Sequence, residues 1–202
     1  EKFAIEISQK YFPTLRLTSE DTKKTEQYQL EARRSELKKS ALTLEEYLKS
    51  LEMKLTIREI EENDIARAAQ LTQKTNQFNL TTRRYTESDI REIKDAPNYR
   101  VWIGELEDKF GSYGKVILAI VKIEGEKAVI DTFLMSCRVM GRNVETDFLA
   151  YIEKELVKDG LREIIGEYIP TLKNSIVSTF WEDTGYITNQ IKNNVISFIH
   201  KV

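Results

Sequence analysis

The only cysteine of the chain stands beside two arginines and a glycine, at the end of a segment that is typical of a β-strand. Cys137 follows the apolar run 128–135, and Arg138, Gly141 and Arg142 come next, before a helical pattern. A strand that turns into a helix leaves backbone N–H groups unpaired, with the positive end of the helix dipole behind them. Such a turn binds phosphate groups through its backbone. The sequence therefore predicts acyl chemistry on a phosphorylated carrier.

Cys137 itself has two interpretations. As a nucleophile it would take an acyl group as a thioester, and the neighbouring arginines and the helix N-terminus would lower its pKa. As a structural residue it would be a small buried side chain at a strand end, because free cysteine is often buried. No base can be placed beside it from the sequence, so both interpretations stay open.

The backbone of the turn is a second candidate site. In the functional interpretation the turn holds the phosphate of a pantetheine arm, because this geometry suits an anion. In the alternative it is a plain strand-to-helix connection in which Gly141 permits a positive φ. The predicted binding residues are Arg138, Val139, Met140, Gly141, Arg142, Asn143 and Val144.

The elements that must position these residues fall into two parts. Residues 1–53 are helical and highly charged, with capping boxes at Thr18–Asp21 and Thr43–Glu46. From residue 54 onward, strand and helix patterns alternate. The patterns predict strands near 55–60, 99–106, 115–123, 127–135, 162–169 and 195–200, and helices near 64–74, 144–158 and 174–184.

Composition excludes several classes of protein. The net charge is −2, with 31 basic and 33 acidic residues interspersed, so no nucleic-acid partner is expected. No apolar run approaches the roughly 20 residues that span a bilayer, so no membrane segment is expected either. One cysteine excludes an internal disulfide and favours the reducing cytoplasm, and with one histidine it makes a zinc site improbable.

The order of these elements resembles that of the GNAT acyltransferase superfamily, and two local motifs add to the likeness. Arg138-Val-Met-Gly-Arg-Asn143 is similar to its pyrophosphate loop, Arg/Gln-x-x-Gly-x-Gly/Ala, with Asn143 in place of the last small residue. The segment 174–186 resembles its late helix, which begins with an asparagine, here Asn174. The resemblance implies an α/β fold with a mixed, mainly antiparallel sheet, here carrying an N-terminal helical extension. It also implies that coenzyme A or phosphopantetheine binds, with Asn174 among the residues near the cofactor.

Two catalytic positions of the superfamily can be compared with this chain. Asp131 lies on the strand where these acyltransferases often keep a general base, although it could equally be an exposed residue or pair with an arginine. The late-helix position that is usually a tyrosine acid is Trp181, and an indole cannot supply that proton. This departure disfavours amine acetylation and suits a thiol acceptor.

A more specific similarity, to FkbH-like proteins, covers nearly the whole chain. It is carried by Tyr11-Phe12, Leu17–Asp21, Ser50–Met53, Gln70–Tyr85, Asp108–Gly114 and Asp131–Glu145. That family joins an N-terminal haloacid-dehalogenase-like phosphatase domain to a C-terminal GNAT-like domain. Because the phosphatase motif Asp-x-Asp-x-Thr is missing here, the resemblance implies that residues 1–53 are the tail of that domain or a linker, and 54–202 the acyltransferase domain.

The same resemblance implies a reaction and a pathway. The glyceryl group of 1,3-bisphosphoglycerate would pass to the phosphopantetheine thiol of an acyl carrier protein, in polyketide-like or surface-polysaccharide biosynthesis. The polar loop 76–82 would then recognise glyceryl hydroxyls, or else cap its neighbouring helices. Arg83 and Arg84 would meet the acidic carrier, or else be merely solvated. The candidate substrate residues are Asn76, Gln77, Asn79, Arg83 and Arg84.

The expected mechanism is positional. The turn holds the pantetheine phosphate, the split between neighbouring strands admits the arm, and Cys137 or the carrier thiol takes the glyceryl group. Two alternatives stay open. The domain could be a non-catalytic docking module for the carrier protein, or an acetyl-CoA-dependent N-acetyltransferase.

Overall fold

The computed structural model describes the backbone of residues 19–202 and the side-chain environments of residues 29–202. The predicted capping box at Thr18 and the segment Tyr11-Phe12 lie outside the described residues. The chain divides into two compact units, one ending at Glu52 and one spanning Met53–Val202. The assignment of residues 1–53 to a phosphatase-like domain stays a prediction.

The described part of the first unit contains α2 (Ser19–Ser40) and α3 (Leu44–Ser50). The Thr43 side chain accepts a hydrogen bond from the Glu46 N–H at 3.1 Å, so Thr43 caps α3 as its motif predicts. The Glu46 carboxylate accepts from the Leu42 N–H, one residue before the position that a capping box requires. The cap is therefore half of the predicted box.

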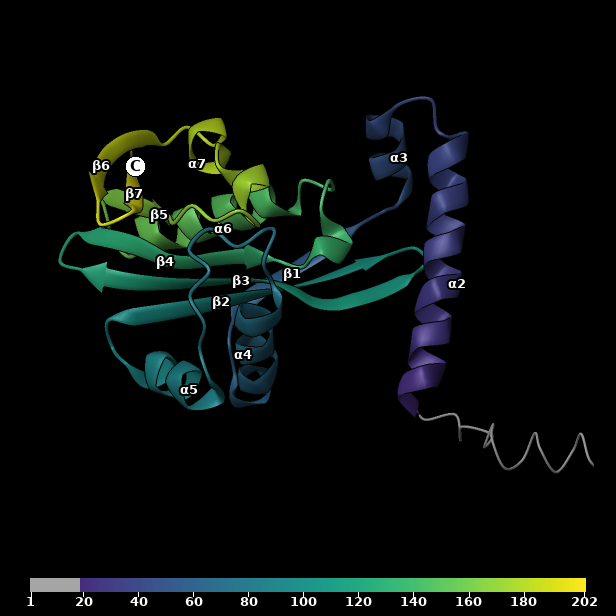
Figure 1. The fold of residues 1–202 in the computed structure, drawn as a ribbon, viewed down its shortest axis with the longest axis horizontal. Helices are drawn as coiled ribbons and strands as arrows, with labels where there is room; N and C mark the ends of the chain where they lie inside the picture. Colours follow the sequence, from purple (N-terminus) through teal and green to yellow (C-terminus); the bar gives the residue numbers. More distant parts are fainter. Residues whose placement is uncertain (1–18) are drawn as a thin grey trace, which may run out of the picture. The chain divides into compact units, whose positions relative to one another are not determined.

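The second unit is built on a seven-stranded sheet of order β1-β2-β3-β4-β5-β7-β6 (Figure 1). Only the β4–β5 pair is parallel, so the sheet is mixed and mainly antiparallel, which confirms the predicted fold class. The strands are β1 (Lys54–Glu59), β2 (Tyr99–Asp108), β3 (Gly111–Glu124), β4 (Lys127–Met135), β5 (Glu163–Tyr168), β6 (Ile187–Lys192) and β7 (Val195–Lys201).

Helices cover both faces of this sheet, as Figure 1 shows. On one face lie α4 (Ile65–Lys74) and α5 (Glu87–Asp95), packed on a buried cluster that includes Leu118 and Leu134. On the other lie α6 (Val144–Lys158) and the short α7 (Phe180–Asp183), packed on a larger cluster. The alternation of side chains along β3 and β4 supplies both cores, because successive residues of a strand face opposite ways.

Three elements differ from the sequence prediction. The helix expected over 174–184 is a 3-10 turn, Ser175–Val177, followed by α7. Helix α5 was not predicted, because Ile90 is its only fully buried residue and the apolar pattern is weak. Strand β6 was not predicted either, since all six of its residues are exposed and no alternation marks it.

The split between β4 and β5 is filled rather than open. The two strands pair only through Lys127–Ile130 and Glu163–Gly166. Beyond that point the segment Phe78–Thr81, here called the inserted segment, takes the free edge of β4. The Leu80 N–H donates to the Phe133 carbonyl at 3.1 Å, and the Met135 N–H donates to the Phe78 carbonyl at 2.9 Å. In this conformation the inserted segment therefore lies where the expected pantetheine arm would enter.

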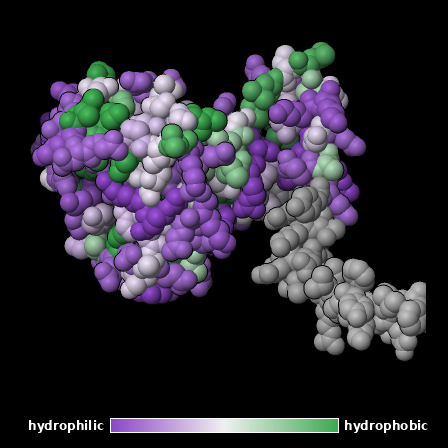
Figure 2. Space-filling view, in the orientation of Figure 1, coloured by the Kyte–Doolittle hydropathy of each residue, from purple (hydrophilic) through white to green (hydrophobic). Residues whose placement is uncertain are grey.

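None of the helices in the described part of the chain combines the length and the apolar character needed to cross a membrane. The surface in Figure 2 is mostly hydrophilic over the second unit, with smaller hydrophobic areas. The large apolar side chains exposed in that unit are Val157, Leu172, Ile176, Ile187, Ile191 and Val202.

Candidate functional site

The turn between β4 and α6 has the backbone geometry of an anion site. A 3-10 turn, Cys137–Val139, follows the strand, and then Gly141 and Asn143 take left-handed conformations with φ of 74° and 59°. Asn143 is the N-cap of α6 but makes no side-chain cap. Within the described part of the chain, the N–H groups of residues 141–143 have no recorded acceptor. The positive end of α6 and these amides therefore face the same exposed turn.

Three arginines surround this turn without a carboxylate partner among the described residues. Arg138 is exposed, and Arg142 lies with its guanidinium carbon 5.0 Å from the ring centroid of Tyr113. Arg67, from α4, donates twice to the Lys115 carbonyl, at 3.0 and 2.8 Å. Burial lowers the pKa of Arg67, and the neighbouring positive charge of Arg138 lowers it further. The turn therefore carries positive charge that an anion would neutralise.

Other predicted residues of the turn are structural. Val139 is fully buried, and Val144 is 3% exposed; both belong to the core on the α6 face. Met140 is half-buried and packs against the same core. Their backbone, rather than their side chains, is what the turn offers to a ligand.

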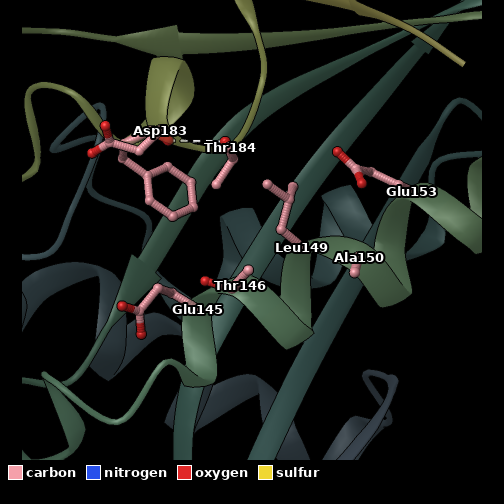
Figure 3. Close-up of a pocket in the computed structure, with 8 residues that line it drawn as sticks. Glu145, Thr146, Leu149, Ala150, Glu153, Asp183 and Thr184 are labelled. Carbon is pink, nitrogen blue, oxygen red and sulfur yellow. Dashed lines mark hydrogen bonds between the residues drawn. The ribbon is translucent and has the colours of Figure 1, made fainter.

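A pocket lies beside this turn, between α6 and α7 (Figure 3). Three carboxylates, from Glu145, Glu153 and Asp183, line it together with Leu149 and the side chains of Thr146, Ala150, Phe180 and Thr184. No arginine, lysine or histidine lines it. Burial raises the pKa of Glu145, one of whose oxygens is buried without a hydrogen-bond partner. The pocket is therefore unsuited to a phosphate, in contrast to the turn.

The structure separates the two predicted catalytic residues. Cys137 is exposed at the turn, so the buried interpretation of its side chain is wrong. Asp131 lies in β4, four positions before Met135, so the Cα atoms of these two residues are roughly 13 Å apart along the strand. Cys137 lies two residues further on. The carboxylate cannot serve as the base for the thiol without a large rearrangement.

Asp131 belongs instead to a polar cluster at the mouth of the split. Its carboxylate accepts from Arg83 Nη1 at 2.5 Å and from the Tyr85 hydroxyl at 2.6 Å. The same Arg83 nitrogen donates to Glu167 of β5 at 2.7 Å. Burial and the hydrogen bond to Asp131 raise the pKa of Tyr85 well above its usual range. Asp131 thus ties the loop to the sheet and is not a free general base.

The other predicted substrate residues also hold the loop in place, with one exception. Arg84 donates to backbone carbonyls, including that of Thr75 at 2.8 Å, and to Asn76 Oδ1 at 2.6 Å. Asn79 is fully buried and accepts from the Thr82 N–H at 2.9 Å. Gln77 and Arg84 are exposed, and among these described residues Gln77 alone has no recorded hydrogen bond. Arg83 and Arg84 are therefore committed to internal contacts in this conformation.

Asn174 and Trp181 also differ from their expected surroundings. Asn174 is fully buried, and its Nδ2 donates to the carbonyls of Asn79 at 2.9 Å and Ile169 at 3.0 Å. It braces the inserted segment and makes no recorded contact with the turn Arg138–Asn143. Trp181 is 1% exposed, with its Nε1 donating to the Glu167 carbonyl at 3.1 Å.

Several residues of the site carry no signal in the sequence. Arg67 reaches the turn from a helix 70 residues earlier in the chain, and Glu167 joins the polar cluster from a neighbouring strand. One position did carry a signal, since glycine inside a strand marks a close approach. A Cβ at Gly166 would lie 2.4 Å from an indole atom of Trp181.

Solved structures with the same arrangement of elements include acetyltransferases, all at low sequence identity. The ribosomal-protein-S18-alanine N-acetyltransferase of Escherichia coli matches with a TM-score of 0.57 and 14% identity, over 74% of this chain and 94% of that one. A domain from Methanocaldococcus jannaschii matches with a TM-score of 0.60 and 15% identity, over 75% of this chain and all of that one. The chain has the GNAT fold.

A third structure with this fold holds a cofactor. The PaiA N-acetyltransferase of Thermoplasma acidophilum, solved in complex with coenzyme A, matches with a TM-score of 0.53 and 16% identity, over 74% of this chain and 99% of that one. No protein-family model and no curated protein matches the chain in sequence. Among the described residues, no group of three metal-ligating side chains comes together.

Proposed function

We propose that this domain takes part in acyl transfer to a phosphopantetheine thiol, with the turn Arg138–Asn143 binding the phosphate. The observation that carries the proposal is the combination of unpaired N–H groups and uncompensated arginines at one exposed turn. Backbone amides at a helix N-terminus and guanidinium groups are both phosphate ligands, and here they converge. The GNAT fold supports a thiol-bearing cofactor, since a protein of this fold was solved with coenzyme A.

The FkbH-like resemblance of the chain narrows the proposal to a glyceryl group and an acyl carrier protein. The carrier thiolate attacks the carbonyl carbon of the acyl phosphate in 1,3-bisphosphoglycerate: a C–S bond forms, the bond from that carbon to the phosphate oxygen breaks, and inorganic phosphate leaves. Water then removes the 3-phosphate in the phosphatase-like domain, which leaves the glyceryl thioester. The thiol proton passes to solvent or to a base of the partner domain. A phosphatase-like domain and a carrier protein are thus the proposed partners, and the cytoplasm the proposed location.

Cys137 has an optional place in this scheme. Its exposed thiol lies at the phosphate end of the site, where it could hold the glyceryl group as a thioester before the carrier arrives. Substituting alanine removes this possibility without disturbing the turn. Trapping a glyceryl adduct by mass spectrometry in the two-domain protein, and losing it in Cys137→Ala, would support the thioester. Unchanged turnover in Cys137→Ala would remove Cys137 from the chemistry.

A non-catalytic docking module is the second candidate, and one observation favours it. The inserted segment takes the edge of β4 that leads to the turn, so a thiol arm cannot pair with that edge in this conformation. Trp181 also leaves the site without the usual acid. In this version the turn still holds the carrier's phosphate, and the phosphatase-like domain performs the chemistry.

The third candidate is an acetyl-CoA-dependent N-acetyltransferase, which the names of two structures of this fold favour. It predicts that acetyl-CoA binds at least as tightly as phosphopantetheine does. An isothermal titration of the chain with acetyl-CoA decides this, since no detectable heat up to millimolar ligand rejects it.

The proposed function is tested by binding. The chain is titrated with acyl carrier protein in its phosphopantetheine form and in its apo form, for the wild type and for the double variant Arg138→Gln/Arg142→Gln. We expect the holo form to bind more tightly, and the double variant to lose at least about tenfold of that affinity. Arg91→Gln is the control, because Arg91 lies in α5, away from the turn, and its ion pair with Glu62 is exposed. Equal binding of apo and holo carrier would reject a phosphopantetheine site.

A further inference from the structure

Both edges of the last part of β4 are occupied. One edge pairs with β3, where Leu118 lies opposite Leu134 and Ile117 opposite Met135. The other edge pairs with the inserted segment, where Asn79 lies opposite Leu134 in an antiparallel bridge. The same segment also reaches across the split, because the Ile169 N–H donates to the Leu80 carbonyl at 2.8 Å. On this edge the Phe133 carbonyl and the Met135 N–H are therefore both taken by the inserted segment.

Side chains hold the inserted segment from both sides of the split. The Thr81 hydroxyl donates to the Asp131 carbonyl at 2.9 Å, and Arg83 binds carboxylates of β4 and β5 together. Asn174, after β5, donates to the Asn79 carbonyl. Arg83 is the central tie, because without its charge Asp131 and Glu167 would face each other as like charges.

Packing completes the closure. The Phe78 ring meets that of Phe180 edge-on, with centroids 5.4 Å apart, and lies 6.3 Å from that of Phe133. Leu80 is fully buried. The edge that these residues cover ends at Met135, two residues before Cys137 and the phosphate turn. An extended arm whose phosphate sits at the turn would run along this edge, pairing its two amide groups with the strand as an added strand does.

We infer that the inserted segment is an exchangeable strand, which must leave the edge of β4 before a phosphopantetheine arm can lie there. This inference rests on the proposed function, since it takes the turn as the site of the arm's phosphate. It adds a closed state to that function. The arm and the segment exclude each other, so the apparent affinity for the arm is lowered by the fraction of molecules that are open.

The closed state should affect the affinities of two phosphate-bearing ligands differently. Inorganic phosphate needs only the turn, so its affinity is independent of the segment. Free 4′-phosphopantetheine needs both the turn and the β4 edge, so its affinity rises when the segment is loosened. Two variants loosen it: Arg83→Gln removes the central tie, and Thr81→Val removes one hydrogen bond with little change of shape. Arg91→Gln is the matched control, an arginine whose partner lies away from the split.

The experiment titrates the full 202-residue chain with each ligand by calorimetry and follows amide hydrogen exchange at Leu80 and Ile169, whose N–H groups are bonded only in the closed state. We expect about tenfold tighter binding of 4′-phosphopantetheine in Arg83→Gln and a smaller gain in Thr81→Val. Phosphate should bind the wild type and all variants within about twofold. Adding 4′-phosphopantetheine should speed exchange at both amides, and Arg91→Gln should behave as the wild type.

Two other results overturn the inference and are distinguishable. If 4′-phosphopantetheine binds the wild type and both loosened variants equally, without changing exchange at Leu80 and Ile169, the segment is not displaced and the turn remains a binding site. If neither ligand binds any variant, while Arg83→Gln still speeds exchange at Leu80, the phosphopantetheine site itself is rejected. Should Arg83→Gln lose its folded circular-dichroism spectrum, Thr81→Val decides between these outcomes alone.

Discussion

Trp181 stands where the GNAT resemblance expects a tyrosine, and its neighbours explain what the indole does there. It is buried over Gly166 of β5, which leaves the space that the ring fills, and its Nε1 donates to the next carbonyl of the strand. Its ring also meets those of Phe133 and Phe180. The residue is therefore part of the core between α7 and the sheet. The indole here is a packing residue and supplies no acid.

This pairing predicts the effect of adding one methyl group. Gly166→Ala places a Cβ within 2.4 to 2.6 Å of three indole atoms, so the ring must move and the free energy of unfolding should fall by roughly 1–3 kcal/mol. Urea unfolding measures it. The double variant Gly166→Ala/Trp181→Phe should lose less than the sum of the two single losses, because the smaller ring relieves the clash. Strict additivity would show that the indole does not occupy this space.

At the scale of elements, one buried carboxylate joins β1, the start of α4 and β3. Asp64 is fully buried, with Oδ1 2.9 Å from Arg58 Nη2 and 2.5 Å from Lys115 Nζ. The Glu61 N–H also donates to it, at 2.8 Å. Burial by itself would raise the pKa of Asp64, but the hydrogen bonds from Arg58 and Lys115 outweigh it and hold that pKa far below its usual range.

Asp64 should therefore make the fold sensitive to acid. Because the pKa of Asp64 is lower in the folded state than in the unfolded chain, its ionised carboxylate stabilises the fold fully at pH values above the unfolded pKa of about 3.9. This stability is lost as the pH falls from there toward the folded pKa. Asp64→Asn should cost roughly 3–5 kcal/mol at pH 7, because it leaves two cations beside a neutral group. It should also flatten the dependence of stability on pH below 4. Unfolding curves from pH 2 to 7 test both, with exposed Asp95→Asn as the control.

The first turn of α6 carries a charge that competes with the proposed ligand. Glu145 lies two residues after Asn143, and burial raises its pKa, so its ionised form is disfavoured in the folded state. This cost is present at neutral pH and disappears as the pH falls through the raised pKa. The carboxylate would also repel a phosphate held at the turn.

Glu145→Gln should accordingly improve binding of inorganic phosphate at pH 7.5. Removing a neighbouring negative charge is worth about 1 kcal/mol, or about fivefold in affinity. Asp147→Asn is the control, since Asp147 is exposed in the same turn. The gain should shrink in 0.5 M salt, because the effect is electrostatic. A weaker affinity in Glu145→Gln would mean that the carboxylate supports the turn instead of opposing the ligand.

At the scale of the whole molecule, the sheet of the second unit has an open edge at β6. All residues of Ile187–Lys192 are exposed, and Ile187 and Ile191 are 72% and 69% exposed. An apolar edge strand is a template for pairing with another chain. Ile191→Lys should leave the free energy of unfolding within about 0.5 kcal/mol while lowering self-association at high concentration. Light scattering measures the association. If the scattering of Ile191→Lys depends on protein concentration as that of the wild type does, the β6 edge does not mediate self-association.

The sequence predicted what depends on neighbouring residues. The Arg138–Asn143 turn, the strand before it and α6 after it follow from local patterns. It did not predict the inserted segment, because the hydrogen bonds of Phe78 and Leu80 join them to residues more than 50 positions away. For the same reason the sequence gives no sign that Arg83 joins Asp131 of β4 to Glu167 of β5.

The inserted segment also sets an order on folding during synthesis. Leu80 bonds to Phe133 and to Ile169, so it leaves the ribosome long before its second partner exists. Until β5 and the residues after it are made, Phe78 and Leu80 lack part of the core in which they pack. Closing such long loops is slow. The strands β1 to β4 can pair as a meander in the meantime. The nascent domain therefore passes through a stage in which the inserted segment can bond to β4 alone, because its other partner, Ile169, has not yet been made.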